Sequence, residues 1–132
     1  MSNLTPEQTT GFAPMDATHA AFLDLLATAQ AADDAALLPA FSELVEHTRR
    51  HFDDEAKLMR ACRFSAAGEH ESEHRRVLGE MSFFLLKLRQ GRRAAARAWL
   101  SEGAADWFRS HLATMDSALA AQCRQAGLPE SA

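Results

Sequence analysis

The feature of this sequence that most constrains its fold is an apolar pattern with the period of an α-helix, repeated in four segments. The pattern runs from Met15 through the first segment and recurs over about 35–62, 68–90 and 93–125. The third segment is the clearest, with steps of three and four between Val77, Leu78, Met81, Phe84, Leu85 and Leu88. No alternating β-branched run indicates a strand. Short connections return each helix alongside the previous one, so the sequence predicts an all-α protein, an antiparallel up-down-up-down four-helix bundle.

The length of the chain fits one such bundle. With 132 residues, of which 47% are hydrophobic and 24% charged, it has the size and composition of a single globular domain. We expect one domain over residues 1–132, with a short N-terminal arm over about 1–14 and the bundle over about 15–125. Asp33 and Asp34 separate the first two segments, and either could cap the second helix.

Charge and apolar content bear on location and partners. The formal net charge of −4 argues against binding to nucleic acid or to an anionic membrane. The first fifteen residues lack the basic start and apolar run of a signal peptide, and no transmembrane-length apolar stretch occurs. We therefore expect a cytoplasmic protein with neither nucleic-acid nor membrane partners. Cys62 and Cys123 fit no metal-binding spacing, and we expect unpaired packing residues near helix ends.

Polar side chains fall on the inward stripe of each segment. His19 lies four residues after Met15, and His70 and His74 lead directly into the third stripe. The second and fourth segments add further inward polar residues: Thr48, His51 and Glu55, and His111. Burying such a group without a partner costs about 1 to 3 kcal/mol, and a carboxylate costs more. A metal ion would turn these groups into ligands, so the sequence predicts a metal site on the bundle axis.

The residue types narrow the choice of metal. Imidazole and carboxylate together suit iron, whereas structural zinc prefers thiolate and four ligands. The di-iron oxidases and ferritin-like proteins use glutamate-rich sites with a Glu-x-x-His pair. The histidine-rich pattern here differs from that cage.

Four motifs occur in a fixed order along the chain. They are His19 in MDATHAAF, His51-x3-Glu55 in HTRRHFDDEAKLM, His70-x3-His74, and His111-x4-Asp116 in DWFRSHLATMD. With these motifs the sequence resembles the hemerythrin family over about residues 12–120. The resemblance implies a four-helix bundle that holds two non-haem irons with a bridging oxo or hydroxo group.

The resemblance also implies how the ligands divide. One iron would take three histidines, the other would take two, and two carboxylates would bridge them: His70, His74 and His111; His19 and His51; Glu55 and Asp116. Seven ligands are too many for one ion and too few to saturate two octahedral ions. An open position is therefore expected at the iron of His19 and His51.

Reversible O2 binding is the function that the resemblance implies, for transport, storage, delivery or sensing, with no enzymatic activity. Small anions such as azide would bind the oxidised protein, and an oxygenase or a signalling protein could be a partner. We expect Trp107, Phe108 and Leu112 to line the ligand pocket. The alternative is a di-iron enzyme with a peroxidase, NO-reducing or iron-scavenging role.

Two departures from the family and one spacing need comment. Many relatives have a second glutamate after the position of Glu55, where this chain has Ala56, and an aromatic residue where this chain has His47. We expect His47 to lie at a solvent-contacting helix edge. His111 and Asp116 are five residues apart, which is about 140° around an ideal helix. We therefore predict a π-bulge or a bend between them.

Two further patterns allow other interpretations. Residues 70–74 also match the H-E-x-x-H pattern of zinc peptidases, with Glu71 as the general base. That reading leaves the other inward histidines unexplained, and we expect Glu71 and Glu73 to be solvated. The basic cluster could contact phosphate or an acidic partner, but a solvated turn is the favoured interpretation of Arg89, Arg92, Arg93 and Arg97.

Overall fold

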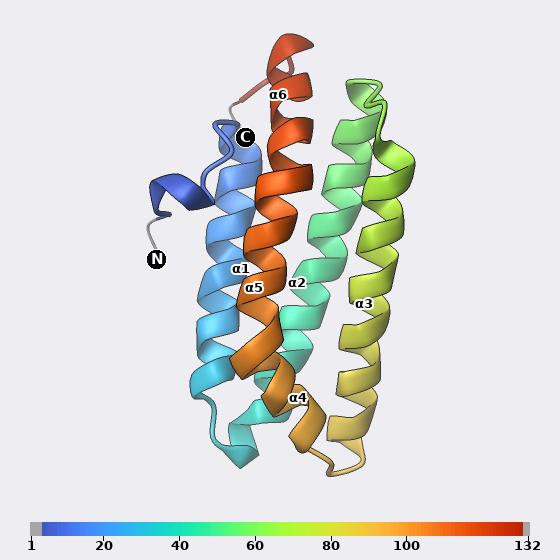
Figure 1. Ribbon diagram of the computed structural model, residues 1–132. Coiled ribbons are helices and arrows are strands. Elements are labelled where there is room, and N and C mark those ends of the chain that lie inside the picture. Colours follow the sequence, from blue (N-terminus) through green and yellow to red (C-terminus); the bar gives the residue numbers. More distant parts are fainter. Residues whose placement is uncertain (1–3, 131–132) are drawn as a thin grey trace.

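The computed structural model describes residues 4–130 and shows an up-down-up-down bundle (Figure 1). After a short 3₁₀ turn at Pro6–Gln8 come three continuous helices, α1 (Ala13–Ala31), α2 (Asp34–Ala61) and α3 (Ala67–Arg89). The fourth column of the bundle is one helix in five parts: α4 (Ala94–Ala98), a π turn (Trp99–Gly103), α5 (Ala104–His111), a second π turn (Leu112–Asp116) and α6 (Ser117–Gln125). No strand occurs between residues 4 and 130. The predicted fold class is confirmed.

The helix ends follow from local chemistry. Asp33 caps α2, because its side chain accepts a hydrogen bond from the backbone N–H of Ala36 at 2.9 Å. Gly91 adopts a φ of 79° in the turn after α3, a conformation that glycine reaches without steric cost. These stops keep the connections short and the neighbouring helices antiparallel.

The chain before α1 is fastened to the bundle. Asp16 accepts hydrogen bonds from the backbone N–H and hydroxyl of Thr10, at 2.7 and 2.8 Å, and from the N–H of Gly11 at 3.3 Å. Arg124 of α6 donates to the carbonyl of Thr10 at 2.8 Å. These bonds hold Phe12, which is fully buried, against the end of the bundle.

Two apolar clusters occupy the interior, with a polar layer between them. The larger is built around Phe22, Leu26, Leu37, Phe41, Leu44, Val77, Met81, Leu100 and Phe108. The smaller consists of Phe12, Met15, Met59, Cys62, Leu119, Ala120 and Cys123. Along α1, His19 lies between Met15 of the smaller cluster and Phe22 of the larger. Along the fourth helix, Asp116 lies between Leu112 of the larger and Leu119 of the smaller, so apolar residues enclose the polar layer from both ends.

The two cysteines are unpaired and buried in the smaller cluster, near the ends of α2 and α6, as expected. Burial and the neighbouring Cys62 raise the pKa of the Cys123 thiol to about 12. Cys123 is therefore a protonated packing residue at neutral pH.

Part of the basic cluster has a structural role that a solvated turn does not describe. Arg97 donates to the carbonyl of Ala32 at 2.7 Å, and both Arg93 and Arg97 pair with Asp34, at 3.3 and 2.9 Å. These bonds join the start of α4 to the α1–α2 connection. None of the helices within the described part of the chain is long and apolar enough to cross a bilayer.

Candidate metal centre

Five histidines and two carboxylates converge in the polar layer, and none of the seven is more than 5% exposed. α1 contributes His19, α2 contributes His51 and Glu55, and α3 contributes His70 and His74. The fourth helix contributes His111, the last residue of α5, and Asp116, the last residue of the second π turn. The structure thus brings together every residue that the sequence suggested as a ligand.

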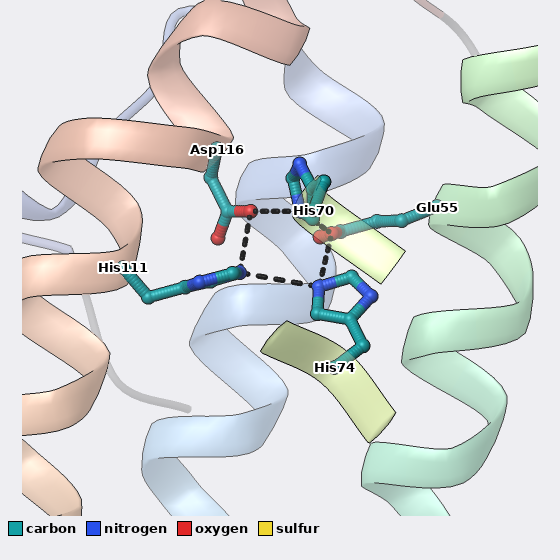
Figure 2. A group of neighbouring side chains, drawn as sticks. All are labelled: Glu55, His70, His74, His111 and Asp116. Atoms are coloured by element: carbon teal, nitrogen blue, oxygen red, sulfur yellow. Dashed lines mark hydrogen bonds and ion pairs between the residues drawn. The ribbon is translucent and has the colours of Figure 1, made fainter. Parts of the chain in front are cut away.

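One part of the layer gathers three imidazoles around one oxygen of each carboxylate (Figure 2). His70 Nε2 lies 3.1 Å from both Glu55 Oε1 and Asp116 Oδ1. His74 Nε2 lies 3.3 Å from Glu55 Oε1, and His111 Nε2 lies 3.2 Å from Asp116 Oδ1. The Nε2 atoms of His74 and His111 are 3.1 Å apart. We call His70, His74 and His111 the three-histidine group.

The other part contains two imidazoles, and the remaining oxygens of the same carboxylates face them. His51 Nε2 lies 2.6 Å from Glu55 Oε2. His19 Nε2 lies 3.4 Å from Glu55 Oε2 and 3.2 Å from Asp116 Oδ2. We call His19 and His51 the two-histidine group. Each carboxylate therefore turns one oxygen toward each group, which is the arrangement of a ligand that bridges two ions.

The chemistry of the layer fits bound cations. Several of its buried polar atoms have no hydrogen-bond partner among the described residues, although neighbours lie close: Nδ1 and Nε2 of His19, Nδ1 of His51, His70 and His111, and Oδ1 of Asp116. Native interiors rarely leave such atoms unsatisfied. Neighbouring donor atoms about 3 Å apart match adjacent ligands on an ion with bonds of about 2.1 Å. The buried histidine and carboxylate groups could thus hold metal ions.

The carboxylates control the protonation of the layer. Burial alone would lower the pKa of His19 and of His70, but Asp116 and Glu55 outweigh it and raise each pKa to about 9. Burial would raise the pKa of both carboxyls, yet the surrounding imidazoles hold it well below its usual range. Burial lowers the pKa of His74. At neutral pH the metal-free layer therefore holds protons that a cation would displace.

The π turn explains how His111 and Asp116 share one side of a helix. Asp116 closes the π turn that begins directly after His111. The hydroxyl of Ser117 donates to the carbonyl of Leu112, five residues earlier, at 2.9 Å. The predicted π-bulge is confirmed. The π turn at Trp99–Gly103 was not expected.

Aromatic rings hold the imidazoles of the three-histidine group. The ring of Phe52 stacks on His74 with centroids 3.7 Å apart, and Trp107 stacks on His111 at 4.8 Å. The indole N–H of Trp107 donates to Glu73 at 3.2 Å. Glu73 is thus half-buried and bonded, which corrects the expectation of a solvated residue. It also pairs with Arg76, three residues on, but Trp107 lies 34 positions away, beyond the reach of a local pattern.

The three residues expected to line a ligand pocket lie in different places. Phe108 meets His19 edge-on, with centroids 5.4 Å apart, whereas Trp107 lies beside the three-histidine group. Phe108 and Leu112 line a cavity of about 250 Å³ between α1, α5 and the N-terminal arm.

The remaining candidates lie outside both groups. His47 is half-buried at the edge of α2, with Nε2 3.3 Å from the carbonyl of Thr18. Glu71 and Ala56 line a hollow beside His74, and neither residue belongs to either group. The H-E-x-x-H interpretation therefore describes only part of a larger ligand set.

Comparison with known proteins agrees with these observations. The family model described as "Hemerythrin HHE cation binding domain" matches residues 10–123. The chain is 32% identical over 117 residues to a bacteriohemerythrin of Ralstonia nicotianae, and the match covers 89% of this chain and 85% of that protein. No solved structure matches the chain significantly.

Proposed function

Because this chain belongs to the hemerythrin family, as its motifs suggested, we propose that it is a non-haem di-iron protein that binds O2 reversibly and is not an enzyme. The observation that carries the proposal is the division of carboxylate oxygens: Glu55 and Asp116 each turn one oxygen to the three-histidine group and one to the two-histidine group. A single-ion site would not need that division.

The proposal assigns seven ligands to one domain formed by residues 1–132. One iron would be held by three imidazoles, the other by two, and both carboxylates would bridge: His70, His74 and His111; His19 and His51; Glu55 and Asp116. Two irons, with an oxo or hydroxo bridge from solvent, would supply reversible two-electron exchange with O2. The two-histidine group, with one imidazole fewer, would leave a position for the exogenous ligand.

Apolar rings and an internally bonded hydroxyl cover part of the layer. Phe22 and Phe108 stack with centroids 5.1 Å apart, and Phe108 covers His19. Thr48 is buried, but its hydroxyl donates to the carbonyl of Leu44 at 2.8 Å. Tyrosine is absent from the chain, which removes one further class of proton donor. A dry, apolar surround protects a reactive ligand from protonation and loss.

Anaerobic titration tests the function. We expect the reduced, iron-loaded protein to show a stoichiometric change in visible absorbance with O2, and a nitrogen purge to reverse it. Elemental analysis should find two irons per chain. Full occupancy by zinc, one metal per chain, or catalytic turnover with a reductant instead of reversible binding would contradict the proposal.

A crystal structure of the oxidised protein with azide tests the ligand assignment. We expect azide at the iron of His19 and His51. Azide at the iron of the three-histidine group, or replacing Glu55 as a bridge, would move the protein toward the alternative of a di-iron enzyme.

A further inference from the structure

A groove between α1 and α2 leads from the surface to the two-histidine group. It encloses about 320 Å³, and two members of the metal layer, His51 and Glu55, lie at its base. The α1 side is formed by Pro14, Met15 and Thr18, and Leu58 of α2 lies opposite. The lining of this groove thus includes both an imidazole of the two-histidine group and a carboxylate of the layer.

The walls of the groove offer little to a polar molecule. The hydroxyl of Thr18 donates to the carbonyl of Pro14 at 3.1 Å and is thereby turned back onto its own helix. The carbonyl of Thr18 faces His47 Nε2 at 3.3 Å. Met15 and Leu58 add apolar surface. A charged molecule passing between these walls would lose hydration without gaining a partner.

The charges at the mouth of the groove are balanced. Asp54 and Lys57 stand exposed at its rim, and an adjoining hollow adds Arg50 and Asp53. Two acidic and two basic groups leave no net charge to attract an ion of either sign. The groove therefore favours small uncharged molecules.

Three further hollows approach the layer less suitably. The one that adjoins the groove also reaches His51, but its lining is polar and charged: Thr18, His47, Arg50, Asp53, Asp54 and Lys57. The hollow between α2 and α3 reaches His74, on the three-histidine side, and is lined by Arg49, Glu71 and Arg75 among others. The cavity between α1 and α5 ends at Phe108, whose ring stands between it and His19.

We propose that the α1–α2 groove is the route by which small uncharged molecules such as O2 reach the two-histidine group, and that Thr18 and Leu58 set its width. The inference rests on the proposed function, because it takes the two-histidine group as the ligand-binding side.

Narrowing the groove tests the route. We expect Leu58→Phe, and independently Thr18→Leu, to slow both association and dissociation of O2 by about tenfold at unchanged affinity, measured by flash photolysis or stopped flow. Ala105→Phe, which fills the α1–α5 cavity instead, should leave the rates unchanged. Slowing by Ala105→Phe and not by the two groove variants would overturn the proposal. Iron content is measured for each variant, and Thr18→Leu decides if Leu58→Phe fails to load.

Charge at the rim gives a second test. Asp54→Lys should speed azide association by about threefold or more and leave the O2 rate unchanged, because only the anion senses the added charge. Asp106→Lys makes the same charge change at an exposed position of α5 and should have little effect. Equal acceleration of azide by the two variants would contradict entry between α1 and α2.

A third measurement needs no iron. Xenon binds dry apolar cavities, so crystals of the metal-free protein under xenon pressure should show density between α1 and α2, and Leu58→Phe should remove it. Xenon confined to the α1–α5 cavity would overturn the route. If the iron-loaded wild type binds neither O2 nor azide, the proposed function fails, while xenon still reports on the groove.

Discussion

The three-histidine and two-histidine groups share their carboxylates but differ in the number of their imidazoles and in how aromatic rings meet them, by stacking on His74 and His111 in the first and by tilted or edge-on contact in the second. His74 and His111 are backed by stacked rings, Phe52 and Trp107, and a charged hollow lies outside them. The two-histidine group has one imidazole fewer, and an apolar groove reaches it beside a polar hollow that also touches His51. The asymmetry thus resides in the imidazoles and their surroundings. On the proposed function, the three-histidine side holds its metal firmly and the two-histidine side admits the ligand.

Removing a shared carboxylate should weaken iron binding at both groups at once. Asp116→Ala takes one ligand oxygen from each group. Replacing a residue that merely hydrogen-bonds a metal ligand already lowers metal affinity by about 10- to 100-fold, so we expect iron affinity to fall by more than about 100-fold here. Asp106→Ala, at an exposed position earlier in the same helix column, should change iron content little. Elemental analysis and the visible spectrum measure the iron content of both variants. Equal loss of iron from the two variants would show that Asp116 is not a ligand.

Removing one imidazole should affect one group more than the other. His74→Ala reduces the three-histidine group to two imidazoles, and we expect about half of the iron to be lost, because His19 and His51 remain. Mössbauer spectroscopy would distinguish the remaining iron. The matched control is His47→Ala, on α2 but outside both groups. Loss of iron from the control would make His47 a ligand.

The pH dependence of the stability of the metal-free protein should come largely from one histidine of each group. The pKa of His19 and of His70 rises from 6.5 to about 9 on folding, so their stabilisation is complete below pH 6.5 and is lost as pH rises through 9. Glu55 and Asp116 have lowered pKa values, and their stabilisation is lost in acid. We expect the urea midpoint to fall between pH 6.5 and 9, and His19→Gln or His70→Gln to remove part of that fall. A midpoint that rises over this range would contradict the assignment.

A change in the aromatic support should have a smaller effect, centred on His74, because Phe52 stacks on His74 and meets His51 only at a tilt. Phe52→Leu removes the ring stacked on His74, and we expect about 1 to 1.5 kcal/mol of destabilisation, as for buried apolar replacements of similar volume. Phe83→Leu is the control, because Phe83 is 51% exposed. Chemical denaturation measures both, and equal losses would show that the stacked ring has no special role.

Glu71→Gln should have the smallest effect of all. Glu71 lies beside His74 but outside both groups, so iron content and O2 binding should be unchanged. A zinc peptidase would instead lose activity and keep its metal. Peptide hydrolysis that disappears in this variant would therefore revive the H-E-x-x-H interpretation.

Local spacing carried much of the fold and the site. Steps of three and four predicted the helices, and the five-residue separation of His111 and Asp116 predicted the π turn between them. The turn at Trp99–Gly103 had no such pair to reveal it. Bonds between distant positions, such as Arg97 with Asp34, also escaped prediction because no local pattern links their partners.

The orientation of the carboxylates could not be predicted from sequence either. Helical spacing places Glu55 on the inward face of α2, but the direction of each oxygen depends on imidazoles from two other helices, α1 and α3, as well as on His51. Only the assembled bundle shows that one oxygen faces each group.

The π turn at Leu112–Asp116 also sets the angular phase of everything that follows it. It accommodates one residue more than a regular helical path, and each residue corresponds to a rotation of about 100°. If the same residues formed a regular α-helix without the π turn, Asp116 and all of α6 would be rotated by about 100° relative to α5. Leu119 and Cys123 would then turn away from the smaller apolar cluster as Asp116 left the metal layer. The π turn therefore sets both the direction of Asp116 in the metal layer and the packing of α6 at the end of the bundle.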